Sequence, residues 1–389
     1  MTALPYTDIA DFRLLPDSGG LIETVAIVLP PVLLSAQAGR FLQNIRAALA
    51  SLAMTLPSGV TLVVLTERSA RDVAGAWLDG LDLACTLEIA ATVDDGALNE
   101  GHIWIQDAFH VAVNSLGVRL YRRTRSDNDG RLATWLAAHD GTRVHDTPLH
   151  LTGGNMLAGE DRKILGFKNV EATARSHRPP IETAAACALL RAFDPLPVFF
   201  FGHRYAENSA DFHRPVPSMA QASPSPAMQP GVHLDLVVSW TGVMRQGKPV
   251  LLVADRKDGL DPALSGRAPE SRAFDACAIR AERWGYQVVR NPVPYLPFPG
   301  SQGIAGPVPR FYNNVLVENE RRPHRDRPLV WVPCFGDVEP GLAAYDKANG
   351  AIWEALGFEV RPVFGWGPLS NSCGAIRCAC KVLKRARPL

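Results

Sequence analysis

Four side chains that lie far apart along this sequence could together attack an electrophilic carbon. A thiol, Cys378, stands near the C-terminus, and a carboxylate, Asp107, ends a Trp-Ile-Gln-Asp string. His233 and Asp235, separated by one leucine, add an imidazole and a second carboxylate. Two carboxylates can hold a planar guanidinium group through charge-assisted hydrogen bonds while a thiolate attacks its central carbon. These residue types therefore indicate chemistry on a guanidinium group.

Plainer explanations exist for the thiol and for the first carboxylate. An isolated cysteine is most often a small, buried apolar residue. Cys378 and Cys380 could bind a metal ion, but the sequence offers no second cysteine or histidine pair at the spacing of a zinc site. We therefore expect no metal. Asp107 could instead cap a helix or form a salt bridge.

His233 and Asp235 begin an apolar stretch that predicts a strand over 234–239. Alternate residues of a strand share one face, so the two side chains would point together. Burying both is costly unless they share partners or meet a cation. An ordinary hydrogen-bonded pair at a sheet edge is the alternative.

Composition and charge exclude several classes of protein. The chain has 389 residues, of which 47% are hydrophobic and 20% charged, as expected of a globular protein with a large core. Its formal net charge is +1, and no basic stripe interleaved with aromatic residues occurs. Neither nucleic acid nor a membrane surface is therefore an expected partner.

Nothing near the start of the chain predicts export or membrane insertion. The first twelve residues lack a basic region before an apolar stretch, and the apolar run 25–34 is interrupted by Pro30 and Pro31. The seven cysteines are mostly isolated within apolar segments, which suits reduced thiols better than disulfides. We expect a soluble, cytoplasmic protein.

Strand-like and helix-like segments alternate along the whole chain, which predicts an α/β fold. Apolar residues recur at helical spacing over 39–54, and β-branched runs predict strands such as 25–29 and 61–65. No repeat of fixed length and no domain boundary is visible, so we expect a single domain over 1–389. A segment rich in Pro and Ser, 215–230, predicts an exposed loop. Further helices are expected over 70–81, 181–192, 273–284 and 342–356.

Taken together, the strings resemble the pentein superfamily of guanidino-group-modifying enzymes, and most of all the catalytic domain of the peptidylarginine deiminases. In that family a Trp-Ile-Gln-Asp string carries the first substrate-binding acid, matched here by Asp107. A His-Val-Asp string carries the catalytic histidine and the second acid, matched by His233 and Asp235. A Gly-x-x-His-Cys string carries the nucleophile, matched by Cys378. A Gly-Gly-Asn turn between the two acidic strings is matched by the turn ending at Asn155.

The resemblance extends over about residues 20–389 and implies a fold, a reaction and roles for residues. The implied fold is a pentein-type α/β propeller of five ββαβ modules around a central active site. The implied reaction is hydrolysis of a guanidinium group through a thiouronium intermediate bound to Cys378, with His233 as acid and base. Asp107 and Asp235 would bind the guanidinium group. The other residues expected to contact substrate are Trp104, Asn155 and Arg377.

Two departures from the family pattern bear on these expectations. Arg377 stands where the family has a histidine before the nucleophile. Acidic residues that help hold calcium in the animal enzymes are replaced by Ala108, Phe109 and His110. Because calcium prefers carboxylate ligands, we expect no cofactor. The chain length resembles that of the compact agmatine deiminases, which belong to the same superfamily.

Several substrates and activities fit this pattern. The Trp-Ile-Gln-Asp string matches the peptidyl enzymes better than the Trp-Met-Arg-Asp string usual in agmatine deiminases, so the predicted substrate is arginine within a peptide or protein, converted to citrulline and ammonia. The alternatives are a deiminase of a small guanidine such as agmatine or free arginine, an amidinotransferase, and a binding module without catalysis.

Overall fold

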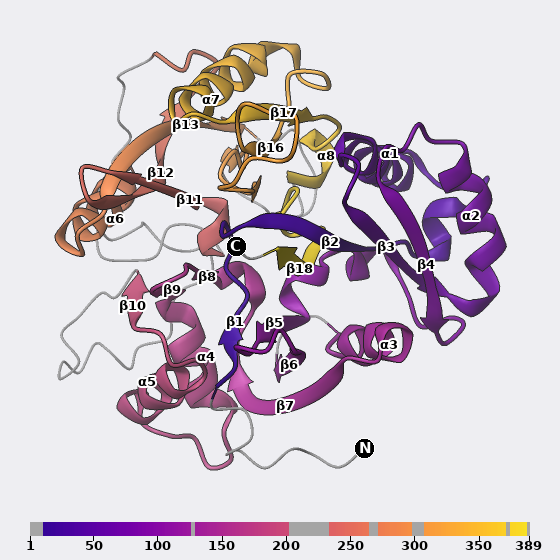
Figure 1. Cartoon of the computed structure of the whole chain (residues 1–389). Coiled ribbons are helices and arrows are strands. Elements are labelled where there is room, and N and C mark those ends of the chain that lie inside the picture. The colour runs from indigo at the N-terminus through magenta and orange to yellow at the C-terminus, as the bar shows by residue number, and fades with distance from the viewer. Residues whose placement is uncertain are drawn as a thin grey trace.

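The protein has a mixed α/β fold built from five small sheets. The structure is a computed structural model that describes residues 11–125, 129–201, 233–263, 271–297, 307–370 and 374–386. Within these ranges the five sheets have three or four strands each, and Figure 1 shows them arranged about a common centre. The loop predicted at 215–230 lies outside the described residues. None of the helices in these ranges has the length and apolar character that crossing a membrane requires.

The same order of elements recurs in every sheet. An antiparallel pair of strands comes first, and a third strand then pairs in parallel with the second strand of that pair. Antiparallel neighbours can be joined by a tight turn, whereas parallel neighbours need a long crossover, which is helical in each sheet. The five sheets thus repeat the ββαβ order that the sequence resemblance implies.

The first three modules, each a sheet with its crossover helices, follow one another along the chain. The first contains β1 (Arg13–Leu14), β5 (Phe109–Val113), β6 (Arg119–Arg125), α3 (Arg131–Asp140) and β7 (Arg143–His150). The second contains β8 (Met156–Ala158), β9 (Lys163–Gly166), α4 (Phe167–Ser176), α5 (Thr183–Ala192) and β10 (Val198–Phe201). The third contains β11 (Val238–Arg245), β12 (Lys248–Asp258), α6 (Ser271–Arg283), β13 (Gln287–Pro297) and β14 (Pro307–Pro309).

The last two modules complete the arrangement, and the fifth combines a C-terminal strand with strands from the N-terminal part of the chain. The fourth contains β15 (Leu316–Val317), β16 (Leu329–Pro333), α7 (Ala343–Ala355) and β17 (Glu359–Val363), and is followed by α8 (Gly367–Ser370). The fifth contains β18 (Lys381–Ala386), β2 (Leu21–Val28), α1 (Arg40–Thr55), β3 (Thr61–Glu67), α2 (Arg71–Asp79) and β4 (Thr86–Val93).

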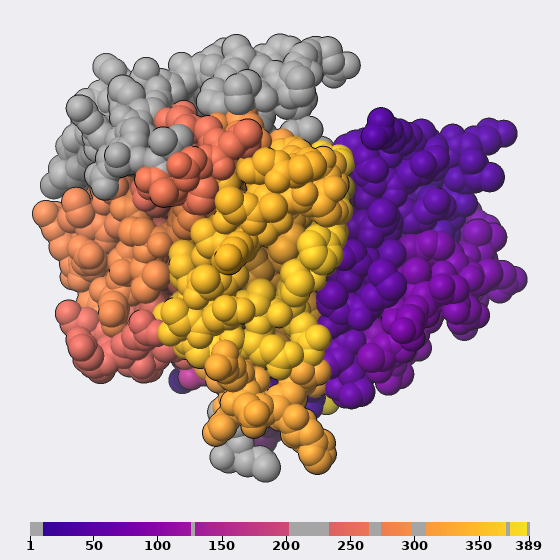
Figure 2. All heavy atoms as spheres, turned by 90° about the horizontal axis from the view of Figure 1, so that it is seen from above, coloured from indigo at the N-terminus to yellow at the C-terminus, as the bar shows by residue number. Residues whose placement is uncertain are grey.

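Pairing between β18 and β2 brings the two ends of the chain together. The strands are antiparallel, with Lys381 opposite Ala26 and Ala386 opposite Leu21. Helix α1 of this sheet also contacts α8 and β17 of the preceding segment. In the space-filling view of Figure 2, the C-terminal part of the surface accordingly lies directly beside the N-terminal part.

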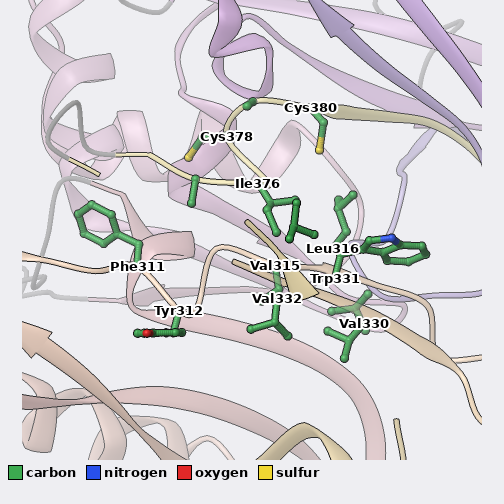
Figure 3. Packing of buried hydrophobic residues seen from close by; sticks show 14 of the residues in the cluster. Phe311, Tyr312, Val315, Leu316, Val330, Trp331, Val332, Ile376, Cys378 and Cys380 are labelled. Atoms are coloured by element: carbon green, nitrogen blue, oxygen red, sulfur yellow. The ribbon is translucent and has the colours of Figure 1, made fainter. Parts of the chain in front are cut away.

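The largest core cluster extends over the third, fourth and fifth modules and includes the tail that carries Cys378. Helix α1 shows how sequence leads to this packing, because its apolar residues Ile45, Leu49 and Leu52 recur on one face and are buried. The prediction of a helix over 39–54 is confirmed. Around the tail, Ile376 belongs to the same cluster as Val315, as Figure 3 shows. The turn that carries the predicted nucleophile is therefore held in a packed apolar layer.

The strand predicted over 234–239 is wrong at its beginning. The structure has a 3-10 helix, η8 (Leu234–Leu236), and β11 starts only at Val238. The backbone N–H of Val237 donates to the carbonyl of Leu234 at 2.9 Å, which closes the turn. His233 and Asp235 therefore do not share a strand face, and any contact between them depends on this turn.

Candidate active site

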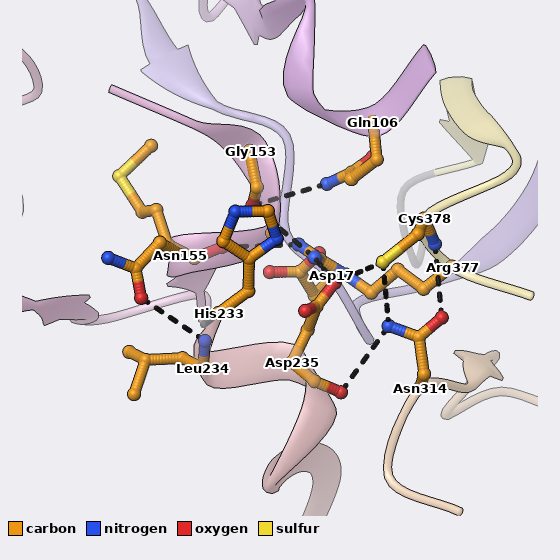
Figure 4. Close-up of polar contacts among 12 residues, drawn as sticks. Asp17, Gln106, Gly153, Asn155, His233, Leu234, Asp235, Asn314, Arg377 and Cys378 are labelled. Atoms are coloured by element: carbon orange, nitrogen blue, oxygen red, sulfur yellow. Dashed lines mark hydrogen bonds and ion pairs between the residues drawn. The ribbon is translucent and has the colours of Figure 1, made fainter. Parts of the chain in front are cut away.

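Each of the five modules brings at least one polar residue to the centre of the molecule. In every module, the strand that begins the ββαβ order is preceded by a tight turn or short 3-10 helix. The buried polar residues at these five turns are Asp107, Asn155, Asp235, Asn314 and Cys378, all between 0% and 7% exposed. Buried polar groups require partners, so their hydrogen bonds define what the site can do. Figure 4 labels Asn155, Asp235, Asn314 and Cys378 of this cluster.

Asn314 holds the turn of Cys378 and contacts its sulfur. Its Oδ1 accepts from the backbone N–H groups of Ala375 at 3.2 Å and of Cys378 at 3.1 Å. Its Nδ2 lies 3.1 Å from Sγ of Cys378, as drawn in Figure 4. The amide thus fixes the position of the sulfur and offers it a hydrogen-bond donor, which favours the thiolate.

The surroundings of Cys378 disfavour the thiolate form of its side chain. Burial raises the pKa of this thiol well above its ordinary value, and the negative charges of Asp235 and Asp107 raise it further. Sγ lies 3.6 Å from Oδ2 of Asp235. The nearby charge of Arg377 acts in the opposite direction. A bound guanidinium cation would favour the thiolate for the same electrostatic reason.

Each of the two carboxylates accepts a hydrogen bond from the protein through one oxygen, and the second oxygens differ in their surroundings. Oδ1 of Asp107 accepts from the backbone N–H of Gly154 at 2.6 Å, and its Oδ2 lies 3.6 Å from Nδ1 of His233. Oδ2 of Asp235 accepts from Arg377 at 2.7 Å. Oδ1 of Asp235 is buried and has no hydrogen-bond partner within the described ranges. An orphaned buried acceptor of this kind suits a ligand that supplies N–H groups.

His233 is the fourth of the predicted catalytic side chains in this cluster. One ring nitrogen, one carboxylate oxygen of Asp235 and Sγ of Cys378 all lie within 4.8 Å of one another. The imidazole is 17% exposed, so it is partly open to solvent although its neighbours are buried. Gly154 makes room for it, because a Cβ atom at that position would lie 2.6 Å from Nδ1 of His233 and 3.1 Å from Oδ1 of Asp235.

The same three groups have the donor types of a metal site, but a cation already occupies their neighbourhood. Nη1 of Arg377 lies 2.7 Å from Oδ2 of Asp235, the oxygen that also faces Sγ of Cys378. A metal ion bound by that oxygen and sulfur would meet the repulsion of the guanidinium charge. Oδ2 of Asp235 is thus already bound by a cation, whereas Oδ1 has no hydrogen-bond partner among the described residues.

Trp104 and Asn155, both predicted to contact substrate, support the turns of the site. A Cβ atom on Gly374 would overlap the indole ring of Trp104, so the ring packs closely against the tail turn. Oδ1 of Asn155 accepts from the backbone N–H of Leu234 at 3.1 Å and so anchors the turn of η8. These contacts position Cys378 and Asp235, respectively.

Arg377 is in the site but has no hydrogen-bond donor left for a substrate. A guanidinium group has five N–H donors. Nε and Nη2 bond to Asp17, Nη1 bonds to Asp235 and to the carbonyl of Gly153, and Nη2 also bonds to the carbonyl of Met156. The residue predicted to bind substrate thus bonds to the protein alone.

Asp17 is a site residue that sequence reasoning missed. It lies in the loop before β2, and its Oδ2 accepts from the backbone N–H of Ala158 at 2.6 Å. Its Oδ1 receives Nη2 of Arg377 at 2.7 Å. No motif surrounds Asp17, and its partner lies 360 positions away, so the sequence carries no local signal for this contact.

Comparison with known proteins identifies the fold. No protein-family model matches the sequence, and no curated protein matches it. Among solved structures, the chain is similar to the agmatine deiminase of C. jejuni, with a TM-score of 0.62, 10% identity, and 97% of each chain covered. The agmatine deiminase of Enterococcus faecalis has a TM-score of 0.62, 14% identity, and 99% of each chain covered.

A protein provisionally named a peptidyl-arginine deiminase is also similar, with a TM-score of 0.64, 13% identity, and 96% of this chain and 98% of that chain covered. All three proteins are named as deiminases. The chain therefore has the same fold as these deiminases. At these identities the likeness concerns the fold, and the chemistry must be argued from the site.

Proposed function

We propose that this protein is a hydrolase that removes ammonia from the guanidinium group of a small guanidine, such as agmatine or free arginine. The observation that carries the proposal is the convergence of Cys378, His233 and two half-satisfied carboxylates, Asp107 and Asp235. A cation with several N–H donors can bond to Oδ1 of Asp235 and to Oδ2 of Asp107 together, and its charge also favours the thiolate. A guanidinium group has these properties.

The reaction follows from the positions of these groups. The free oxygens of Asp107 and Asp235 hold the guanidinium group, each charge-assisted hydrogen bond being worth about 1.5–3 kcal/mol. The thiol of Cys378 gives its proton to the imidazole of His233, and the resulting thiolate adds to the central carbon to give a tetrahedral adduct. His233 then donates a proton as the C–N bond breaks, so that ammonia leaves and a thiouronium remains on sulfur.

A second half-reaction releases the product. His233, now neutral, accepts a proton from a water molecule that attacks the thiouronium carbon. The C–S bond then breaks, which regenerates the cysteine and releases a ureido product. One water is consumed and one ammonia released, so atoms balance without any oxidant or reductant.

The five repeats of the ββαβ order support the further inference that the sheets form the five-module propeller of the superfamily.

Similarity among solved structures favours a small substrate over the peptidyl substrate expected from the Trp-Ile-Gln-Asp string. Two of the similar proteins reported above are agmatine deiminases, and the C. jejuni enzyme has also been observed as a cysteine-to-serine variant with substrate bound. The string that favours a peptide is only four residues long and ends at the acid that any guanidinium substrate would need. We therefore place small guanidines first.

Substrate profiling tests this proposal directly. The purified full-length protein is incubated with agmatine, with free arginine and with an arginyl peptide blocked at both ends, and ureido product and ammonia are measured. We expect product from a small guanidine and at least about tenfold less from the peptide, a difference of about 1.4 kcal/mol in transition-state binding. Preference for the peptide would overturn the substrate class, and no ureido product from any substrate would overturn the reaction.

Two additions to that assay separate neighbouring activities. Glycine or another primary amine is added as acceptor, and transfer of the amidine group would show an amidinotransferase instead of a hydrolase. A parallel sample is dialysed against a chelator. Because Arg377 supplies the cation beside Asp235, we expect full turnover after chelation, and loss restored by calcium would show that a metal is required.

A further inference from the structure

The guanidinium group of Arg377 lies between two carboxylates, next in sequence to the proposed nucleophile. Asp17 binds it on one side, with Nη2 to Oδ1 at 2.7 Å, and Asp235 binds it on the other, with Nη1 to Oδ2 at 2.7 Å. The arginine is 7% exposed. Burial alone would lower the pKa of Arg377, but Asp17 and Asp235 more than reverse this effect, so it stays charged.

Asp235 needs this cation more than an ordinary carboxylate does. Its side chain is fully buried, and burial raises its pKa, while the charge of Asp107 raises it further. Arg377 provides the largest opposing influence, ahead of His233. Without Arg377 the buried carboxylate would hold a proton over a wider pH range. A protonated Asp235 is a poor acceptor for a cationic guanidinium group.

We propose that Arg377 is a positioning residue, which holds Asp235 as a charged acceptor with one oxygen free and does not itself touch the substrate. This inference rests on the proposed function, because it assigns Asp235 to the substrate. The bond from Nη1 occupies Oδ2 and leaves Oδ1, which lies next to Gly154 and His233, for the guanidinium group. Asp17 in turn keeps Arg377 from moving into the space that the substrate needs.

The other charged and titratable groups around this pair do not replace Arg377. Lys381 lies in the same buried region, but burial lowers its pKa to about 7, and its Nζ donates to the carbonyl of Gln106 at 3.1 Å. Arg385 donates to backbone carbonyls, including that of Val317 at 2.9 Å. The remaining groups are Asp17, Asp107, His233 and Cys378. Arg377 is the one cationic side chain with a hydrogen bond to Asp235 among the described residues.

The test compares Arg377→Gln, Arg377→Lys and a matched control, Arg322→Gln, in the full-length protein. Arg322 is also a buried arginine paired with a carboxylate, but its partners Glu318, Ile22 and Ser58 lie outside the site. Two readouts are taken across a range of pH. One is kcat and KM for agmatine, and the other is the rate at which iodoacetamide alkylates Cys378 without substrate.

Arg377→Gln should raise KM at least about tenfold and shift the acid limb of kcat/KM to higher pH by about one unit or more. Alkylation of Cys378 should also move to higher pH, because Arg377 favours the thiolate. Arg377→Lys keeps the charge but not the planar fork, so it should raise KM while leaving the acid limb close to that of the wild type. Arg322→Gln should lower thermal stability and shift neither profile.

Each alternative result has a definite meaning. Wild-type KM and acid limb in Arg377→Gln would overturn the proposal, and so would an equal shift in Arg322→Gln. If Arg377→Gln does not fold, Arg377→Lys decides, since an unchanged KM in that variant would contradict the positioning role. If the wild type turns over no guanidine, the proposed function fails. The alkylation profile then still shows whether Arg377 is coupled to the thiol.

Discussion

The sulfur of Cys378 occupies a poor place for a thiolate until a cation arrives. Two carboxylates raise the pKa of the thiol, and burial raises it more, whereas Asn314 and Arg377 partly compensate. A bound cation would oppose the influence of the two carboxylates on this pKa. If Cys378 is the proposed nucleophile, we therefore expect it to react more readily when a guanidinium group is bound.

Cys378→Ala should abolish turnover without abolishing binding. The variant lacks the nucleophile, so we expect kcat to fall roughly 10³-fold or more. The carboxylates that hold the guanidinium group are unchanged, so agmatine should still bind. Calorimetric titration of the variant with agmatine, together with ureido-product assays, checks both parts. Retention of full turnover would show that Cys378 is not the nucleophile.

Asn314→Asp should raise the pKa of Cys378 further. The substitution replaces a donor 3.1 Å from Sγ with a negative charge of nearly the same shape. Because a raised thiol pKa reduces the thiolate fraction at any pH below it, the alkylation rate at neutral pH should fall by at least about tenfold and recover at alkaline pH. Measuring that rate against pH tests this, with Asn349→Asp as a control for a buried asparagine elsewhere. An unshifted profile would exclude a role of Asn314 in the charge state.

At the scale of elements, the recurring turn before the first strand of each module creates the site. The 3-10 helices η5 (Ile105–Asp107), η6 (Gly153–Asn155) and η8 each end at or contain a residue of the central cluster. A short turn packs its backbone close to neighbouring turns, which only small residues allow. Gly153 and Gly154 serve this purpose in η6, since a Cβ atom on either would meet groups of η5 or η8.

The two glycines of η6 should respond differently to alanine. A Cβ atom on Gly154 would press on movable side-chain atoms of His233 and Asp235, so Gly154→Ala should lower kcat/KM at least about tenfold with a small change in stability. A Cβ atom on Gly153 would overlap the backbone carbonyl of Gln106, so Gly153→Ala should cost about 1–3 kcal/mol of stability. Steady-state kinetics and thermal unfolding of both variants check this contrast. Equal effects on activity and stability would contradict it.

Sequence patterns predicted elements best where apolar periodicity alone decides the structure. The helices expected over 181–192 and 342–356 agree with α5 and α7 to within a few residues. Strand β6 escaped prediction because its residues include several arginines. Arg122 is nonetheless buried there and stacks on the ring of Phe193, a partner that only the folded chain supplies. A pattern of apolar residues therefore does not predict a strand that contains buried charged side chains.

Some residues of the candidate site were also predictable from the sequence, and others were not. Short strings identified Asp107, His233, Asp235 and Cys378 because family resemblance attaches to those residue types, and the structure brings them together. Periodicity could not reveal that His233 and Asp235 lie on a 3-10 turn. The supporting contacts of Asn155 and Arg377, and the contribution of Asp17, depend on partners from distant modules, so no local pattern could assign them.

At the scale of the whole molecule, the pairing of β18 with β2 both completes the fifth sheet and fixes the position of Cys378, the proposed nucleophile. The turn of Cys378 directly precedes β18, and β18 is held by its pairing with β2 from the other end of the chain. Arg385 on β18 reinforces this closure, because its Nη1 donates to the carbonyls of Gly19, Gly20 and Val317. Loss of the last strand would therefore remove both a sheet and the fixed position of the sulfur.

Two neighbouring residues of β18 test this coupling between closure and activity. Arg385→Gln leaves four backbone carbonyls, those of Gly19, Gly20, Val317 and Asp17, without their donor, so the free energy of unfolding should fall by about 4 kcal/mol, at about 1 kcal/mol for each. Lys384→Gln removes only a surface pair with Glu23, which should change stability by about 1 kcal/mol or less. Urea unfolding gives both values, and alkylation of Cys378 in the same samples reports on the accessibility of its sulfur.

If the pairing of β18 with β2 positions the sulfur, Cys378 in Arg385→Gln should become accessible to iodoacetamide at urea concentrations below the main unfolding transition. Exposure of the thiol only together with global unfolding would separate the two and contradict the coupling.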